Sequence, residues 1–179
     1  MLEYENIWVV EQVLTKTGEE FSRAFSDESI ISIMGVSNDL NSKPFECERS
    51  KMFPGDMYFG VEIKTTNSVI KAYISPDYGC SEIYGAMISQ DDVSFFVGAK
   101  LKTIYLTDVA CNTEYVDHIL SCDNDGGDYC NIQFINFETD KGVLQLTVYN
   151  CDNGYYGHDI IIQIDDNVEY ENKIGGKLQ

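Results

Sequence analysis

Strict alternation of apolar and polar residues constrains this chain more than any other feature of its sequence. Between residues 143 and 149, Leu144, Leu146 and Val148 fall on one face of an extended chain, and Val143, Gln145, Thr147 and Tyr149 fall on the other. Side chains of a strand point alternately to its two faces, so this period of two predicts a strand with one face in a core. Residues 59–64 alternate in the same way.

Further segments have the length and composition of strands. We expect strands at 69–75, 101–107, 115–120 and 129–137, with 59–63 and 69–75 forming a hairpin around the turn at 66–68. A second hairpin is predicted between 142–150 and 155–164. Asp152-Asn153-Gly154 lies between these two segments, and Asn-Gly readily adopts the positive φ angles of a type I′ turn.

Two segments have the composition of a helix. In 89–98, Ser89 is placed to cap the N-terminus, acidic residues follow in the first turn, Phe95 and Phe96 would face inward, and Gly98 stands beyond the end. Residues 18–25 also favour a helix, and 29–35 has the length of a short strand. The predicted fold class is α+β: a mostly antiparallel β-sheet of six to eight strands with one or two short helices packed on it.

A chain of 179 residues is long enough for one domain with a real core. We divide it into an N-terminal segment at 1–55, a β-rich core domain at 56–172 and a tail at 173–179. No apolar run is long enough to cross a membrane, and the N-terminus lacks the basic and apolar regions of a secretory signal. These features predict a cytoplasmic protein that does not bind membranes.

Six cysteines stand at positions 47, 80, 111, 122, 130 and 151, with no Cys-x-x-Cys pair among them. Scattered cysteines in a chain without a secretory signal are typical of reduced cytosolic proteins. We therefore expect free thiols, most of them acting as small core residues.

The charge is strongly negative and unevenly distributed. Thirty acidic and twelve basic residues give a net charge of −18, and from Thr103 onward fourteen acids face only three lysines. Such a field repels nucleic acid and anionic lipid and attracts cations and basic protein surfaces. Solubility alone is the simpler interpretation of this charge.

Three turns gather chemically active residues. In 149–159, Cys151, His158 and two aspartates could bind a metal or form a Cys-His pair, or could simply pack at a turn between strands. In 122–128, three aspartates surround Gly-Gly, but their order does not match an EF-hand, so a flexible acidic loop is the alternative to weak calcium binding. The third turn, 75–85, combines an aspartate, a cysteine and a glutamate with two glycines and two tyrosines.

No catalytic motif is present. The sequence has no phosphate-binding glycine loop, no Gly-x-Ser-x-Gly and no His-Glu-x-x-His, and its only histidines are His118 and His158. We expect a protein that is not an enzyme, with no catalytic residues and no cofactor.

Several stretches between residues 59 and 164 resemble a small domain family of unknown function from bacterial phages, plasmids and other mobile elements. The similarity rests on IKTTNSVIKAYIS, GCSEIYG, SQDDVSFFVGAKL, IYLTD and FINFETDKGVLQLTVYNCDNGYYGHD. It includes the Asn-Gly-Tyr-Tyr-Gly-His motif at 153–158, whereas Gly79-Cys80 replaces the paired cysteines usual in the family. The resemblance implies an antiparallel β-rich fold and an origin in a mobile element, and it assigns no catalytic residues.

Two hypotheses follow. The first is an inhibitor similar in charge to anti-CRISPR proteins, a mimic of nucleic acid that docks on a basic nucleic-acid-binding partner, such as a CRISPR effector nuclease, without itself binding nucleic acid. Its candidate partner-binding residues are Asp123, Asp125, Asp128, Asp152, Asp159, Asp165, Asp166 and Glu169.

The alternative is a metal- or small-ligand-binding domain that uses the turns at Asp77–Gly85 and Asp152–His158. Its candidate ligand-binding residues are Tyr78, Glu82, Tyr155 and Tyr156, and its candidate metal ligands are Cys151 and His158.

Overall fold

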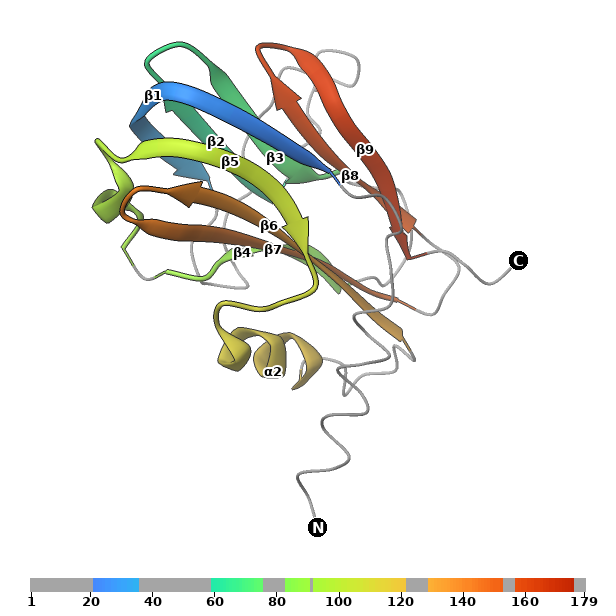
Figure 1. Ribbon diagram of the computed structural model, residues 1–179. Helices are drawn as coiled ribbons and strands as arrows, with labels where there is room; N and C mark the ends of the chain where they lie inside the picture. Colours follow the sequence, from blue (N-terminus) through green and yellow to red (C-terminus); the bar gives the residue numbers. More distant parts are fainter. Residues whose placement is uncertain are drawn as a thin grey trace.

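The structure is a computed structural model that describes residues 21–35, 59–75, 83–90, 92–121, 129–152 and 157–175. These residues form nine strands in a single antiparallel sheet with the order β4-β7-β6-β5-β1-β2-β3-β8-β9 (Figure 1). The strands are β1 (Ser22–Gly35), β2 (Phe59–Thr65), β3 (Val69–Ile74), β4 (Ile83–Ile88), β5 (Lys100–Thr107), β6 (Tyr129–Thr139), β7 (Gly142–Asp152), β8 (Gly157–Ile164) and β9 (Asn167–Gly175).

The long strand β1 joins two halves of this sheet. Its first part pairs with β5 and its second part pairs with β2, and the register shifts between Ala24 and Glu28. Asp27, inside this irregular stretch, has a φ of 54°. An irregularity of this kind bends a strand, which lets one strand turn the corner between two packed sheets.

The two halves enclose the main core. Its buried side chains come from both halves, including Ile104 and Phe137 on one side and Ile70 and Ile162 on the other. Strand β9 crosses over the opposite half: the Tyr170 ring lies 5.5 Å from that of Phe21, and the Asn150 side-chain amide donates to the Ile174 carbonyl at 3.2 Å. The sheet therefore folds back on itself like a sandwich.

A smaller cluster lies on the outer face of β4, β7 and β6. It is covered by helix α2 (Thr113–Ser121), which contributes Val116 and Ile119. Figure 1 shows α2 at the bottom of the molecule and the β8–β9 turn at the top.

The mostly antiparallel sheet predicted from the alternation is confirmed, but its second predicted hairpin is wrong. β7 lies between β4 and β6, while β8 lies between β3 and β9, so 142–150 and the described part of 155–164 belong to different halves. Alternation shows that a segment is a strand, but it does not show which strand lies beside it. In the described part of the chain, a tight turn with two consecutive positive φ angles is formed by Asp165-Asp166, between β8 and β9 (49° and 68°).

The predicted helices are not where the sequence placed them. Residues 115–120, predicted as a strand, lie in α2, because Val116 and Ile119 have helical spacing and Asn112 caps the helix. In the described part of 89–98, the only helix is the 3₁₀ helix η2 (Val93–Phe96). Asp92 rather than Ser89 caps it, and Phe95 is exposed while Phe96 is buried.

The described part of 18–25 has no helix, because residues 22–25 start β1, which continues through the predicted strand at 29–35.

The sheet also crosses the predicted domain limits. β1 lies in the middle of the sheet although its residues fall within the predicted N-terminal segment 1–55, and β9 continues to Gly175, past residue 172. The expectation of free thiols is wrong for two cysteines, because Cys130 and Cys151 are joined by a disulfide. Cys111 is free and exposed.

Candidate functional site

Helix α2 and the loop before it carry exposed acids, and hydrogen bonds and buried side chains fix their backbone to the sheet. The loop leaves β5 at Thr107, whose hydroxyl accepts the Val109 N–H at 3.1 Å. The side-chain oxygen (Oδ1) of Asn112 accepts the Glu114 N–H at 3.0 Å, and this hydrogen bond caps the first turn of α2. Val116 and Ile119 face the sheet, so Glu114 and Asp117 point to solvent.

Gln145 of β7 fixes this loop to the sheet. Its side-chain oxygen accepts the Cys111 N–H at 2.7 Å, and its side-chain nitrogen donates to the Val109 carbonyl at 2.9 Å and to the Asn136 side chain at 2.7 Å. Gln145 is only 1% exposed, so these bonds form away from water, where leaving them unmade is costly. The loop is therefore preorganised.

We define the acidic α2 surface as Asp108, Val109, Glu114 and Asp117. Its three acids are exposed, and Val109 is 67% exposed, the highest value among the large hydrophobic residues described. No lysine or arginine occurs between Lys102 and Lys141, and within the described residues none of the three acids forms an ion pair.

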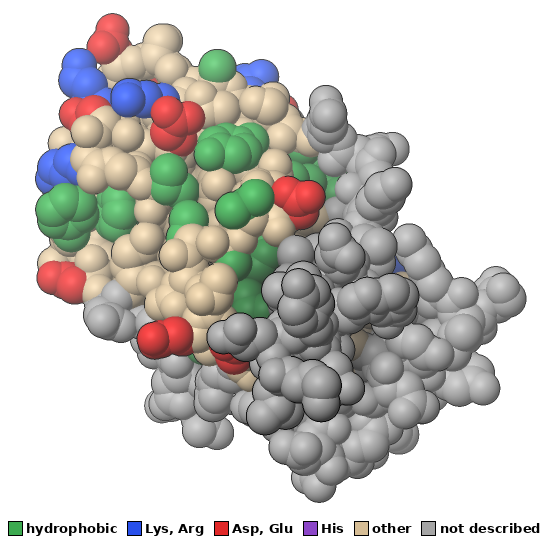
Figure 2. Space-filling model, turned by 60° about the horizontal axis from the view of Figure 1, so that its bottom comes forward, with side chains coloured by type: hydrophobic (Ala, Val, Ile, Leu, Met, Phe, Trp, Pro, Cys, Tyr) green, Lys and Arg blue, Asp and Glu red, His purple; other side chains and the backbone are tan. Residues whose placement is uncertain are grey.

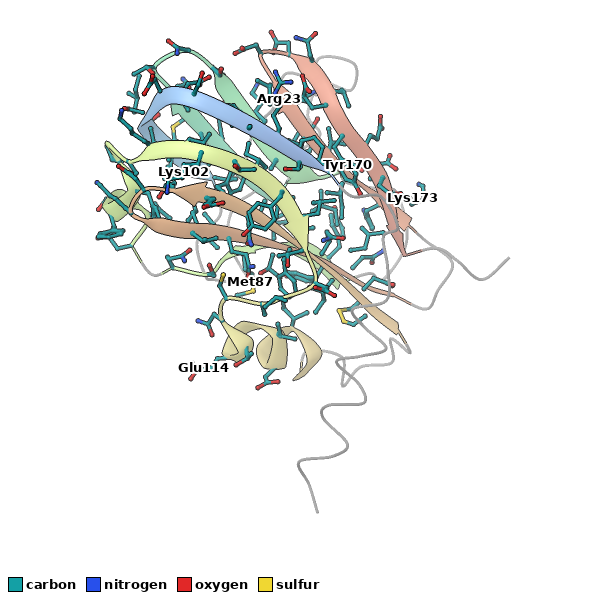
Figure 3. All side chains as sticks on the ribbon, viewed as in Figure 1. Arg23, Met87, Lys102, Glu114, Tyr170 and Lys173 are labelled. Atoms are coloured by element: carbon teal, nitrogen blue, oxygen red, sulfur yellow. A yellow bond between two sulfur atoms is a disulfide. The ribbon has the colours of Figure 1, made fainter. Side chains whose placement is uncertain are left out.

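Figures 2 and 3 agree with this distribution of charge. Glu114 projects from α2 away from the sheet, whereas Met87 lies between the helix and the sheet (Figure 3). In the described part of the surface in Figure 2, lysine and arginine side chains gather mainly at the upper left, while acidic side chains are spread more widely. Among the described residues, no cation pairs with the acids of the acidic α2 surface, so its negative field is not compensated there.

The acids that the sequence predicted to bind a partner do not belong to the acidic α2 surface, as far as the structure describes them. Asp159 lies 3.5 Å from Lys173, Asp166 lies 4.0 Å from Lys71, and Glu169 lies 4.0 Å from Arg23.

Asp165, the fourth predicted acid in β8–β9, accepts the Val69 N–H at 2.8 Å. Of the remaining candidates, Asp152 ends β7, and three lie outside the described residues: Asp123, Asp125 and Asp128.

The predicted metal ligands are not brought together. Cys151 is bonded to Cys130 in the outer cluster, whereas His158 is fully buried on the other face of the sheet. The His158 ring stacks on Tyr84 with 4.0 Å between centroids, and its Nδ1 lies 2.7 Å from the Ser75 carbonyl oxygen, so that nitrogen carries the proton and donates. The described residues contain no group of three or more His, Cys, Asp or Glu that could hold a metal ion.

The candidate small-ligand residues Tyr78, Glu82, Tyr155 and Tyr156 lie outside the described residues. The sequence interpretation missed the acidic α2 surface, because it placed a strand at 115–120. The available signal was an Asn-Thr-Glu cap followed by apolar residues three apart. The role of Gln145 had no comparable signal, because it depends on which loop crosses above it.

The comparison with known families gives one match. A family described as a domain of unknown function, DUF7448, matches residues 54–162. The chain belongs to this family. The DUF7448 match includes β2 to β7, α2 and most of β8, and it excludes β1 and β9.

No curated protein and no solved structure matches the chain. In the described residues, no helix is both long and apolar enough to cross a lipid bilayer.

Proposed function

We propose that this protein is a non-enzymatic acidic binding protein whose acidic α2 surface docks on a basic nucleic-acid-binding protein. One observation carries the proposal: three exposed acids without ion-pair partners in the described residues stand on a preorganised loop and helix. In the β8–β9 hairpin, at the other end of the strand order, the chain's own cations or backbone hold Asp159, Asp165, Asp166 and Glu169.

The arrangement suits recognition of lysine and arginine side chains. At long range, an arginine-lined groove responds to spaced carboxylates as it does to spaced phosphates. At contact, the exposed Val109 side chain adds apolar area between the charges. The backbone of α2 is held in place because Val116 and Ile119 are buried, so little backbone order is lost on binding.

The partner we propose is a CRISPR effector nuclease, and the proposed role is inhibition by occupation of its nucleic-acid groove. This part of the proposal is supported by the net charge of −18 and by the resemblance of the sequence to proteins of phages and other mobile elements. It follows that the inhibitor and DNA compete, and that binding weakens as salt rises.

The test measures DNA cleavage by a purified, guide-loaded CRISPR effector nuclease at increasing concentrations of this protein, at low and high salt. The α2 variant carries Asp108→Asn, Glu114→Gln and Asp117→Asn. The matched control carries Asp27→Asn, Glu62→Gln and Glu171→Gln, which change the net charge equally but lie on β1, β2 and β9. We expect the wild type and the control to inhibit and the α2 variant to fail.

A third variant tests the acids that the sequence suggested, with Asp159→Asn, Asp166→Asn and Glu169→Gln. Loss of inhibition in this variant alone would place the docking surface at β8–β9 rather than at α2. Equal losses in all three variants would mean that only total charge matters, and no inhibition by the wild type would reject this partner.

We propose no second function. The turns at 77–85 and 152–158 lie largely outside the described residues, and no described contact at them favours a metal or a small ligand.

A further inference from the structure

The Cys130–Cys151 disulfide lies in the same apolar cluster as α2. The two cysteines face each other directly across β6 and β7, and they are 7% and 4% exposed. The cluster around them includes Val116 and Ile119, two buried residues of α2. The disulfide is thus part of the apolar cluster against which α2 packs.

Helix α2 depends on this cluster for its stability. It has nine residues, whereas isolated helices need roughly 12–15 residues to be even marginally stable in water. Its order therefore comes from packing of Val116 and Ile119 into the outer cluster. Anything that loosens β6 against β7 beneath the helix changes how firmly α2 is held.

We propose that Cys130 and Cys151 form a redox-sensitive device that controls the order of α2. The same disulfide also controls the affinity of the acidic α2 surface for its basic partner; this second part rests on the proposed function. Both cysteines are buried, so a thiol reaches the bond when the outer cluster opens. By linkage, a partner that holds α2 in place protects the disulfide, and reduction weakens binding of that partner by the same factor.

The chemistry is ordinary thiol–disulfide exchange with a low-molecular-weight disulfide of the glutathione type. On oxidation, the Cys130 and Cys151 thiols lose two protons and two electrons, and a sulfur–sulfur bond forms between them. The disulfide bond of the reagent breaks and yields two thiols, which take up the same protons and electrons. Reduction by excess thiol runs the same steps in reverse.

The test uses the full chain with its other four cysteines replaced, so that only one pair can react. The background substitutions are Cys47→Ser, Cys80→Ser, Cys111→Ser and Cys122→Ser. Oxidised glutathione or a phosphine reductant sets the redox state, and intact mass confirms the loss or gain of two hydrogens. Because the reduced protein needs no substitution at Cys130 or Cys151, the test does not depend on the folding of a cysteine-free variant, and Cys130→Ala with Cys151→Ala serves as a second open form.

The first readout is amide hydrogen exchange. We expect exchange at 113–121 to become roughly tenfold faster or more on reduction, while amides of the β2–β3 hairpin keep their rates. Unchanged exchange in α2, or equal acceleration in the hairpin, would overturn the proposal, because the bond would then be without influence or would stabilise the whole fold.

The second readout is inhibition of the guide-loaded nuclease by the oxidised and reduced forms. Weaker inhibition by the reduced form supports the device, and equal inhibition by both forms overturns control of binding. Inhibition by neither form would reject the proposed function, and hydrogen exchange alone would then decide whether the disulfide controls α2.

Discussion

The two ends of the strand order differ in the surroundings of their acids: α2 covers β4, β7 and β6 at one end, and β8 and β9 form the other. At the β8–β9 end, Asp159 and Asp166 lie within 4.0 Å of lysines, and Asp165 accepts a backbone N–H. At the α2 end, the polar contacts serve the backbone and the helix cap, and the acids are left to solvent. Both ends are acidic in sequence, so the location of the cations, rather than the number of acids, distinguishes a self-compensated surface from one available to a partner.

The largest expected difference between the two ends concerns two buried glutamines. Gln145 makes three side-chain hydrogen bonds at the α2 end, whereas the Gln163 side-chain oxygen is buried without a hydrogen-bond partner in the described part of the chain. Gln145→Leu should lower the free energy of unfolding by about 2–4 kcal/mol, because it leaves buried polar groups unpaired. Gln163→Leu should be neutral or raise it by up to about 1 kcal/mol.

Urea unfolding of the two leucine variants measures this difference. The two glutamines are matched, since each is in a strand and less than 10% exposed: Gln145 is 1% exposed and Gln163 is 6% exposed. Equal losses in the two variants would show that the three side-chain hydrogen bonds of Gln145 add no more stability than the unpaired Gln163 side-chain oxygen does.

A smaller difference in stability should appear when single acids are neutralised. Asp117→Asn should raise the free energy of unfolding by about 0.2–0.5 kcal/mol, because Asp117 stands three residues after Glu114 on the helix and the two charges repel. Asp159→Asn should lower it by about 0.2–1 kcal/mol, the range for a solvent-exposed ion pair such as Asp159–Lys173.

Opposite signs are therefore expected at the two ends, and both effects should shrink in high salt. A double-mutant cycle with Lys173→Gln isolates the Asp159–Lys173 coupling. The same sign for both neutralisations would remove the contrast between the two ends.

The smallest effect concerns Cys111, which reports on the loop before α2. Partial burial raises the pKa of the Cys111 thiol above its ordinary value. Because only the thiolate reacts, iodoacetamide at neutral pH should alkylate Cys111 more slowly in the folded chain than in urea. Gln145→Leu should bring the folded rate closer to the rate in urea, and identical rates in the wild type would mean that the loop does not shield the thiol.

Alternation, together with the length and composition of apolar segments, was sufficient to identify most strands. Residues 59–64, 101–107, 129–137 and 143–149 all lie in strands. Burial of both faces was not predicted: in β7, Leu144, Leu146 and Val148 face the main core, while Gln145 and Tyr149 on the other face are also buried. Pairing could not be predicted in the same way. The Asn-Gly at 153–154 suggested a hairpin, yet the hydrogen-bond partners of β7 and β8 are set by the packing of whole halves.

The candidate site was predicted only in its general character. Charge indicated an acidic binding protein but pointed to acids at 123–128, at 152 and in β8–β9. A sequence count cannot show that Lys71 of β3 lies beside Asp166 and that Lys173 of β9 lies beside Asp159. Likewise, the disulfide was missed because Cys130 and Cys151 become neighbours only through the register of β6 and β7.

The place of β1 has a consequence for the DUF7448 domain as a unit of folding. The matched residues 54–162 contain both neighbours of β1, β5 and β2, but not β1 itself. A polypeptide cut to the matched range would lose the strand that hydrogen-bonds to both halves and would expose the edges of β5 and β2, which would favour pairing with foreign strands. Residues 22–35 therefore act as an intramolecular donor strand, and the same strand supplied by another chain could take its place through domain swapping.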